Sequence, residues 1–434
     1  MSNDGMGRRR FLKNSALGVA GAGLLANAGN LVAEEGKKVE PLKIKKFRKL
    51  GRTEFMASDI SSGFCNNAAV LRAAIEAGVN YIDTAESYRN QPAVGEAIQG
   101  FDRKKLFITS KLVIKEESSK EEVIKRTRKC LEELKTDYLD CMMIHSCENR
   151  KLIGAKGFHD AMKQLKTEGK VRHVGISNHG TNWARDGEES MAKVLLAAAA
   201  DGRFDVMLLA YNFLQTERGA DVLKACKEKN IGATLMKVNP VGQYYGTKER
   251  VEKMRKEGKE VSERLKTALE RYKKRAEMAD DFIKKYDLKN PVEIRNAAIR
   301  FTLDNPDVNT VCCAFRSFED LDAFIPLSGT TLSGVEKKKL AAYKEGCGSL
   351  YCRHACGICE SKCPNQVPVN TIMRYNHYYE AHGREKYALK RYALLDAPKA
   401  NLCENCEGNC EIACPYGVPT QGMMVMAHQR LSLV

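Results

Sequence analysis

Short apolar runs alternate with amphipathic segments through most of the 434-residue chain. Runs of strand length begin at eight places, which are Ile60–Phe64, Val79, Leu106, Tyr138, Val171, Phe204–Tyr211, Gly232–Val238 and Val308–Phe315. Apolar helix faces lie between them in Ala68–Ala77, Val94–Ile98, Val123–Leu134, Phe158–Leu165, Met191–Ala200 and Ala220–Cys226. Eight strands that alternate with helices at this pitch predict an α/β fold whose main part is a closed parallel (β/α)8 TIM barrel.

Two further segments accompany this repeat. Residues 41–59 form short alternating runs with a break at Gly51, which predicts a hairpin that plugs the floor of the barrel. A charged insertion, Thr247–Lys285, separates the seventh and eighth strands and carries opposite charges three and four residues apart. This pattern is typical of an exposed, solvated helix; a lid over the barrel mouth or a docking surface is the alternative.

Ionisable residues stand where three successive strands end. Asp83, Lys111 and His145 close these strands in turn, and Tyr88 ends the polar loop behind Asp83. The carboxyl ends of barrel strands share the active-site face, so we expect these groups to converge. An adjacent ammonium lowers the pKa of a phenol, a carboxylate holds the ammonium in place, and an imidazole can hold a carbonyl oxygen against the phenol.

Asp83, Tyr88, Lys111 and His145, in this order, resemble the catalytic tetrad of the aldo/keto reductases. The resemblance covers Lys46 to Phe324 and includes Leu50-Gly-Arg-Thr53, Asp83-Thr-Ala85, Thr109-Ser-Lys111 and Gly169-Lys-Val-Arg-His-Val-Gly-Ile-Ser-Asn178. It implies that hydride from a nicotinamide reaches a carbonyl carbon while Tyr88 donates a proton to the oxygen. By the same resemblance, Lys111 lowers the pKa of the phenol, Asp83 holds Lys111, and His145 orients the carbonyl.

The resemblance also implies a binding site for NAD(P), made by Ser177, Asn178, Tyr211, Arg316 and Ser317. Ser177 and Asn178 match residues that contact the nicotinamide carboxamide, Tyr211 is expected near the ring, and the last two would face an adenosine phosphate. The chain departs from the family at Leu208, where Gln is common, and acids follow Ser317 at positions 319, 320 and 322. NADP, NAD and no nicotinamide therefore remain open.

Eight of the 16 cysteines form two runs near the carboxyl end. The runs are Cys352-x3-Cys356-x2-Cys359-x3-Cys363-Pro364 and Cys403-x2-Cys406-x3-Cys410-x3-Cys414-Pro415. Each resembles the C-x2-C-x2-C-x3-C-P run of two-cluster ferredoxins, with one spacing longer by a residue. The resemblance implies two [4Fe–4S] clusters and a crossover of each fourth cysteine, so the ligand sets would be Cys352, Cys356, Cys359 and Cys414, and Cys403, Cys406, Cys410 and Cys363. Two zinc sites or a disulfide framework are the alternatives.

The amino terminus predicts an export signal. Arg8-Arg9-Arg10-Phe-Leu-Lys13 matches the twin-arginine pattern, a weakly apolar run follows, and Ala26-Asn27-Ala28 offers a cleavage site. The run is too short and Gly-rich to span a membrane stably, and a disordered basic tail is the alternative. We expect a periplasmic or otherwise exported protein with no transmembrane span in the mature chain. Its parts would be a signal and linker (1–33), a barrel (41–345) and a ferredoxin-like iron–sulfur domain (346–434).

Together these features predict an exported oxidoreductase that interconverts a small carbonyl compound and its alcohol by hydride transfer, with electrons relayed through two [4Fe–4S] clusters. The alternative is an electron-transfer or docking subunit of an exported redox complex, with a barrel that is not catalytic. The formal net charge of +16 suits an anionic surface or an acidic redox partner protein. No nucleic-acid-binding signature occurs in the sequence, so we expect no nucleic acid partner.

Overall fold

The computed structural model describes residues 41–432, apart from 179–188, 241–266, most of 268–282, and residues 289, 355 and 381–383. The export signal predicted at 1–33 and most of the charged insertion at 247–285 therefore lie outside the described residues.

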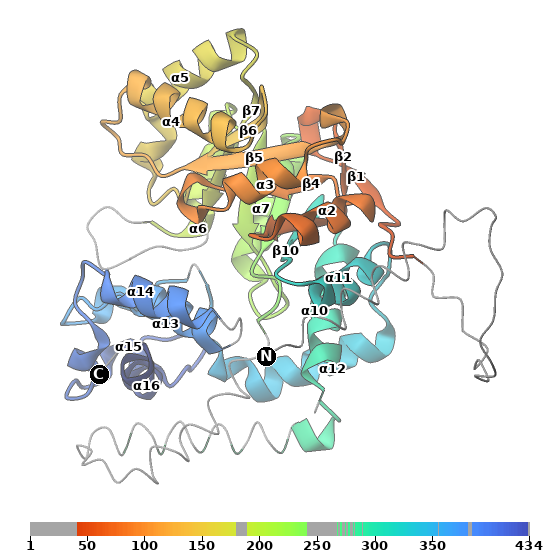
Figure 1. Ribbon diagram of the computed structural model, residues 1–434. Coiled ribbons are helices and arrows are strands. Elements are labelled where there is room, and N and C mark those ends of the chain that lie inside the picture. The colour runs from red at the N-terminus through yellow and green to blue at the C-terminus, as the bar shows by residue number, and fades with distance from the viewer. Residues whose placement is uncertain are drawn as a thin grey trace, which may run out of the picture.

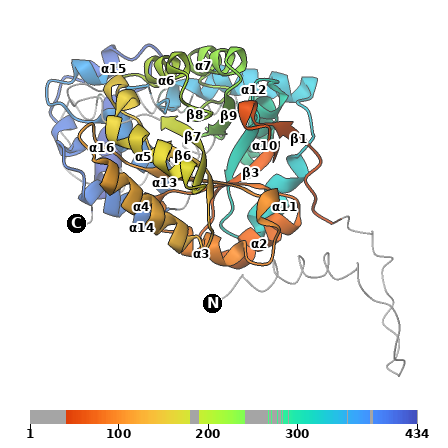
Figure 2. The same cartoon turned by 90° about the horizontal axis from the view of Figure 1, so that it is seen from above.

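Eight parallel strands close into a barrel (Figures 1 and 2). In order around the barrel they are β10 (Thr310–Ala314), β3 (Ile60–Phe64), β4 (Tyr81–Asp83), β5 (Phe107–Leu112), β6 (Leu139–Ile144), β7 (Val171–Asn178), β8 (Val206–Ala210) and β9 (Gly232–Met236). Each strand pairs in parallel with both neighbours. The predicted (β/α)8 barrel is confirmed.

Helices surround the strands (Figure 2). They are α2 (Ala68–Glu76), α3 (Gln91–Ala97), α4 (Lys120–Glu133), α5 (Lys156–Thr167), α6 (Met191–Asp201), α7 (Glu217–Glu228), α10 (Pro291–Asp304) and α11 (Phe318–Phe324). Several begin at a side-chain cap that satisfies otherwise unpaired backbone N–H groups; the Asn67 side chain, for example, accepts from two of them at the start of α2. All six helical segments predicted before the insertion are confirmed, whereas α10 and α11 were not anticipated.

A hairpin closes the floor of the barrel, as predicted. Strands β1 (Phe47–Lys49) and β2 (Met56–Ser58) pair antiparallel, and Leu50 between them is fully buried. Leu50 belongs to an interior cluster with Tyr81 and Phe107, whose rings stack 5.4 Å apart. Gly51 has a φ of 50°, and a Cβ there would lie 2.3 Å from the backbone nitrogen of Gly232, so only glycine fits. The interior is thus a packed core that fixes the strand ends above it.

The carboxyl-terminal part is helical and shares a core with the barrel. Its helices are α12 (Gly334–Cys347), α13 (Val369–Glu380), α14 (Glu385–Ala393), α15 (Asn409–Ile412) and α16 (Thr420–Leu431), and α13 to α16 lie together in blue in Figure 1. Two of these, α13 and α14, fall in the stretch 369–392 that is rich in Tyr, Arg and His. The buried side chains of α12 to α16 form one cluster with Phe213 and Leu214 of the barrel. The predicted boundary at 345/346 falls inside α12, whose apolar residues join that cluster.

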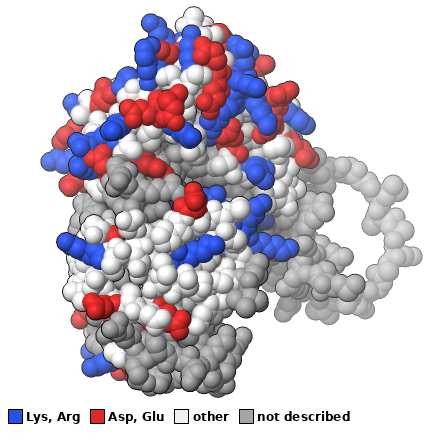
Figure 3. Space-filling model, turned by 90° about the vertical axis from the view of Figure 1, so that its left-hand side faces the viewer, with Lys and Arg blue, Asp and Glu red and all other residues white. Residues whose placement is uncertain are grey.

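The face of the molecule in Figure 3 differs between its two parts. The upper part of Figure 3, over the barrel, is crowded with acidic and basic side chains, and the lower part, over the carboxyl-terminal helices, carries fewer. Large apolar side chains are exposed among the carboxyl-terminal residues, and these include Ile358, Leu402 and Ile412. Within the residues that the structure describes, no helix has the length and apolar character needed to cross a membrane.

Candidate active site and cysteine pocket

The four residues of the predicted tetrad meet at the carboxyl ends of adjacent strands. Asp83 is the last residue of β4, Lys111 lies near the end of β5, and His145 directly follows β6. Tyr88 ends a short 3-10 helix, η3 (Glu86–Tyr88), in the loop after β4. In the strand register Asp83 stands opposite Thr109, two residues before Lys111, so the two side chains come from neighbouring positions on one face.

Asp83 and Lys111 form a buried ion pair. Lys111 Nζ lies 2.6 Å from Asp83 Oδ2 and donates a second hydrogen bond, of 2.7 Å, to the carbonyl oxygen of Thr84. Their side chains are 2% and 0% exposed. Burial raises the pKa of Asp83 to about 6, and the attraction of Lys111 offsets part of that rise. The Lys111 ammonium is therefore held in place by a carboxylate whose pKa is close to neutral pH.

The Tyr88 ring is close to both Lys111 and His145. Lys111 Nζ is 4.7 Å from the ring centroid, and the His145 ring meets it edge-on with centroids 5.5 Å apart. Burial raises the pKa of Tyr88 well above its usual value, and the negative charge of Asp83 raises it further. The sequence predicts that Lys111 lowers this pKa; burial dominates instead, so the phenol stays protonated at neutral pH.

His145 is neutral in this setting. Burial lowers its pKa to about 3, with further lowering by the positive charges of Lys111, Arg374 and Arg391. His145 Nδ1 lies 3.2 Å from Ser87 Oγ, which leaves Nε2 for another partner. A neutral imidazole beside a protonated phenol can donate or accept a hydrogen bond without a change in net charge.

The residues expected to hold a nicotinamide lie at or just beyond the carboxyl ends of three strands, β7, β8 and β10. Ser177 and Asn178 end β7 and are buried; Asn178 Nδ2 donates a hydrogen bond to the carbonyl oxygen of Cys147 at 2.5 Å. Tyr211, expected near the nicotinamide ring, instead stacks on Phe301 of α10 with centroids 5.9 Å apart. Its ring therefore points toward the outer helices and not toward the tetrad, because side chains alternate between the two faces of a strand.

Arg316 and Ser317 lie at the start of α11, after β10. The backbone N–H of Arg316 donates to Asp320 Oδ2 at 2.8 Å, and a hydrogen bond from Ser317 lowers the pKa of Glu319. The acidic residues Asp320 and Glu319 therefore contact Arg316 and Ser317, the two residues expected to face an adenosine phosphate.

The mouth of the barrel contains three residues that the sequence did not single out. Lys237 follows β9, and its Nζ donates a 2.6 Å hydrogen bond to the hydroxyl of Tyr378 in α13. Arg384, just before α14, lies over the ring of Phe64 at the end of β3. The position of Lys237 directly after a barrel strand could have indicated from the sequence that it lies at the barrel mouth. The sequence contains no such indication for Tyr378 and Arg384, because they come from another part of the chain.

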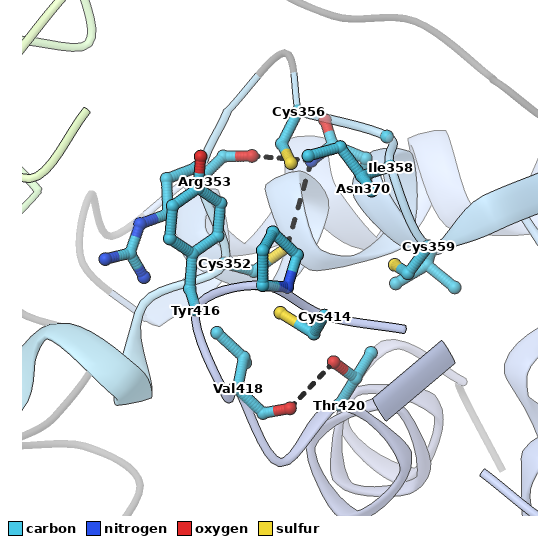
Figure 4. Close-up of a pocket in the computed structure, with 13 residues that line it drawn as sticks. Cys352, Arg353, Cys356, Ile358, Cys359, Asn370, Cys414, Tyr416, Val418 and Thr420 are labelled. Atoms are coloured by element: carbon cyan, nitrogen blue, oxygen red, sulfur yellow. Dashed lines mark hydrogen bonds between the residues drawn. The ribbon is translucent and has the colours of Figure 1, made fainter. Parts of the chain in front are cut away.

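Four cysteines line a pocket in the carboxyl-terminal part (Figure 4). They are Cys352, Cys356 and Cys359 of the first run and Cys414 of the second. Burial raises the pKa of Cys352 well above its usual value, and the neighbouring thiols of the other three raise it further. Asn370 Nδ2 approaches Cys352 Sγ at 3.8 Å and donates to the carbonyl oxygen of Arg353 at 2.6 Å. Cys414 of the second run thus lies with three cysteines of the first run.

The other four cysteines form a second group. Burial raises the pKa of Cys403 to about 12, with contributions from Cys406 and Cys363. Burial likewise raises the pKa of Cys410, and Cys403, Cys406 and Cys363 add to the effect. Cys363, the last cysteine of the first run, thus lies with the second run. Among the residues that the structure describes, no three His, Cys, Asp or Glu side chains converge closely enough to hold a single metal ion.

The fold and the strand-end site define a (β/α)8 barrel protein of the aldo/keto reductase type, and the sequence comparison agrees. Residues 62–343 match the aldo/keto reductase family. The match spans more than half of the chain, so the chain belongs to this family.

Among individual proteins, the chain is 33% identical over 159 residues to methylglyoxal reductase DkgB of Salmonella typhimurium, which is 36% of this chain and 57% of that protein. It is 40% identical over 110 residues to glyoxal reductase of Bacillus subtilis, 25% of this chain and 38% of that protein. The chain thus spans about half the length, or less, of these relatives. A solved aldo-keto reductase from Klebsiella pneumoniae in complex with NADPH superposes with a TM-score of 0.48, at 21% identity, over 68% of this chain and 94% of that one.

Proposed function

We propose that the barrel interconverts a small carbonyl compound and its alcohol, with Tyr88 as the proton donor. The observation that carries the proposal is the buried Asp83–Lys111 pair beneath the Tyr88 ring, next to a neutral His145. A surface lysine costs little to keep charged, but a fully buried one is kept only where its charge is held and used. The relatives named for methylglyoxal and glyoxal reduction support small carbonyl substrates.

Each residue has a defined task in this reaction. Tyr88 is protonated at neutral pH and gives its proton to the carbonyl oxygen as negative charge develops there. His145 Nε2 hydrogen-bonds the same oxygen and fixes the carbonyl against the phenol. Lys111 stabilises the phenolate left behind, and Asp83 keeps Lys111 in position. A nicotinamide, when bound, supplies the hydride.

The preference between NAD and NADP follows from the residues that are expected to bind the nicotinamide cofactor. Ser177 and Asn178, at the end of β7, are the proposed contacts of the carboxamide. Glu319 and Asp320 lie against Arg316 and Ser317, which disfavours a 2′-phosphate there and favours NAD over NADP. Tyr211 takes no part in this proposal because its ring stacks on Phe301.

The two cysteine groups are proposed to hold two [4Fe–4S] clusters, as in ferredoxins. Neighbouring thiolates repel one another in a buried site, so these cysteines ionise together only beside a strong positive charge, which iron would provide. In a four-iron cluster each thiolate binds a different iron, so four sulfurs around a pocket suit a cluster even where no three converge on one ion.

Helix α13 connects the cysteine pocket with the barrel mouth, which supports an electron relay. Asn370 near its start contacts Cys352, and Tyr378 near its end contacts Lys237. The two residues are eight positions apart along the helix, a span of about 12 Å. Exposed Ile358, Leu402 and Ile412 lie beside the cysteines in sequence and offer an apolar contact for a redox partner protein.

Export by the twin-arginine route completes the proposal, because that route carries proteins that are already folded around their cofactors. It rests on Arg8 and Arg9 and the apolar run behind them. Replacing both with Lys should leave the precursor in the cytoplasm with its cofactors assembled. Unchanged export of that variant would remove the basis for the signal.

Replacement of Tyr88 by Phe tests the catalytic proposal. Phe keeps the ring packing against His145, so the fold and the iron content should be unchanged, while turnover of an aldehyde should fall about 10²- to 10⁴-fold. The assay needs anaerobically purified protein, with bound iron, sulfide and nucleotide counted per chain. Equal turnover with and without the hydroxyl would favour the alternative function, an electron-transfer subunit with an inactive barrel.

A further inference from the structure

The turn that carries Tyr88 is too short to be stable by itself. Tyr88 is the last residue of η3, a single turn of 3-10 helix, and its backbone N–H donates to the carbonyl oxygen of Ala85 at 3.0 Å. Such a turn has poorer hydrogen-bond geometry than an α-helix and needs contacts from outside to persist. The next residue, Arg89, has a φ of 56°, in the left-handed region that favours glycine. The position of the Tyr88 ring therefore depends on what holds this turn.

Arg126 of α4 binds the first residue of the turn. Its Nε and Nη2 atoms donate to the two carboxylate oxygens of Glu86 at 3.0 and 2.6 Å, so the pair is bidentate. The Arg126 and Glu86 side chains are 23% and 35% exposed, so water screens their attraction and the pair adds little to the stability of the whole protein. Its geometry is nevertheless well defined, because a planar guanidinium matches a carboxylate in one orientation. The pair therefore fixes the turn two positions before Tyr88.

Arg126 also binds the segment that carries Lys111. Its Nη2 donates to the carbonyl oxygen of Val113 at 2.9 Å, and Val113 lies two positions after Lys111, just beyond the end of β5. Its Nη1 donates to Glu122, one turn earlier in α4, at 3.0 Å. All three guanidinium nitrogens thus donate to the protein itself, and the hydrogen bonds to Glu86 raise the pKa of Arg126, so it stays charged. One guanidinium joins η3 to the backbone next to the tetrad lysine.

A second contact connects the same turn with His145. Ser87 immediately precedes Tyr88, and its Oγ lies 3.2 Å from His145 Nδ1. Lys111 Nζ and the His145 ring both lie close to the Tyr88 ring. The relative positions of the phenol, the ammonium and the imidazole therefore depend on this one turn and on the contacts that hold it.

A pocket of about 600 Å³ opens beside the ion pair. Both partners of the pair line it, together with Ser87, Arg89 and Lys129. Small solutes can therefore reach the Glu86 carboxylate from solvent. Removal of the Arg126 side chain would leave room there for a small cation of the same shape, which makes the role of the guanidinium testable by its replacement from solution.

We propose that Arg126 and Glu86 are positioning residues that hold Tyr88 in place against Lys111 and His145, so that proton transfer to the carbonyl oxygen depends on a guanidinium outside the tetrad. This inference rests on the proposed carbonyl chemistry of Tyr88. Both residues act through the η3 turn, and neither supplies a group to the reaction. Misplacement of a reacting group by about 1 Å can lower a rate about 100-fold, so loss of the pair should appear mainly in kcat.

Kinetics of paired variants test the proposal. Arg126→Gln should lower kcat for a neutral aldehyde about 10- to 100-fold, with KM changed less than about 3-fold. Glu86→Gln should give a similar loss, and the double variant should lose no more than either single variant, because the two side chains act as one unit. Arg128→Gln is the matched control, since Arg128 lies in the same helix, pairs with Glu168 and is 58% exposed. Its kcat should equal that of the unchanged protein, and additive losses in the double variant would overturn the proposal.

Replacement of the guanidinium from solution gives a readout that a general structural defect would not produce. Arg126→Ala should lose kcat as Arg126→Gln does, and added methylguanidinium should restore most of it by binding Glu86 from the pocket. The same addition should leave the double variant Glu86→Gln, Arg126→Ala unchanged, because its carboxylate is absent. Equal restoration in both variants would overturn the proposal.

Fluorine NMR separates this proposal from the catalytic one, because it needs no turnover. In protein labelled with fluorotyrosine, the Tyr88 resonance is identified by its loss in Tyr88→Phe. Burial raises the pKa of Tyr88, so a turn released by Arg126→Gln should move this resonance and lower the pH at which it titrates, with Arg128→Gln unchanged. If turnover needs the Tyr88 hydroxyl while Arg126→Gln changes neither kcat nor the resonance, the positioning role is refuted and the catalytic role stands. If Tyr88→Phe turns over normally, the catalytic role fails, and an unmoved resonance in Arg126→Gln would then refute the positioning role as well.

Discussion

The protonation of Asp83 should set the acid limb of the pH–rate profile. Burial raises its pKa to about 6, whereas burial and nearby cations lower the pKa of His145 to about 3. Between pH 5 and 8 His145 therefore stays neutral, and Asp83 is the tetrad member that changes its charge. With a pKa of about 6, about a tenth of Asp83 is ionised at pH 5 and about nine tenths at pH 7. We therefore expect kcat/KM to fall close to 10-fold from pH 7 to pH 5.

Asp83→Asn tests this assignment. Asn is neutral at every pH, so the variant should have the low activity of the protonated form and show no acid limb down to pH 5. His145→Gln should lose activity but keep the limb at about pH 6. The measurement is kcat/KM for a neutral aldehyde in overlapping buffers of constant ionic strength. An acid limb that survives in Asp83→Asn and disappears in His145→Gln would refute the reasoning.

The same raised pKa predicts the sign of a stability effect. Folded Asp83 holds its proton up to about pH 6, whereas in the unfolded chain it releases the proton near the ordinary carboxyl pKa of 3.8. The folded state thus binds more protons in this window, and its stability falls as pH rises through it. The difference of about two units between the folded and unfolded pKa values corresponds to about 3 kcal/mol in the free energy of unfolding. Asp83→Asn should remove this part of the pH dependence, as measured by denaturant unfolding between pH 4 and 7.

Three further predictions concern the rest of the molecule. Cys352→Ser should reduce bound iron from about eight per chain and change the visible spectrum, while Cys347→Ser, a buried cysteine outside both groups, should not; equal iron in both variants would count against the cluster assignment. Asn370→Leu removes the hydrogen bond to Cys352 and should make the potential of that cluster more negative in a redox titration, with the second cluster unchanged as the internal control. Gly51→Ala should destabilise the barrel by more than about 1 kcal/mol, because the new Cβ would lie 2.3 Å from the Gly232 nitrogen, whereas Gly334→Ala, in open space, should not; equal unfolding midpoints would contradict this.

The order of apolar runs in the sequence determined the barrel. Strands in such a barrel are buried on both faces, so each is a compact and mainly apolar run, and an ionisable residue stands at or next to the carboxyl ends of β4, β5 and β6. This is why Asp83, Lys111 and His145 could be predicted as a group: their positions depend on local strand ends and on one repeated unit. The cysteine runs could be recognised for a similar reason, because ligand spacing within a loop is a local property.

Tertiary structure alone decided how distant segments meet. Tyr211 follows a predicted strand, yet the side of the strand on which its ring lies depends on register, and the structure turns it toward Phe301. The direction of the Tyr88 pKa shift also depends on burial by other elements, which outweighs the effect of the nearby Lys111. The meeting of Lys237 and Arg384 with Tyr378 has no sequence signal at all, because it arises where a helix from after the barrel packs across the barrel mouth. Local patterns record which residues share an element, and only the packing of elements decides which residues share a site.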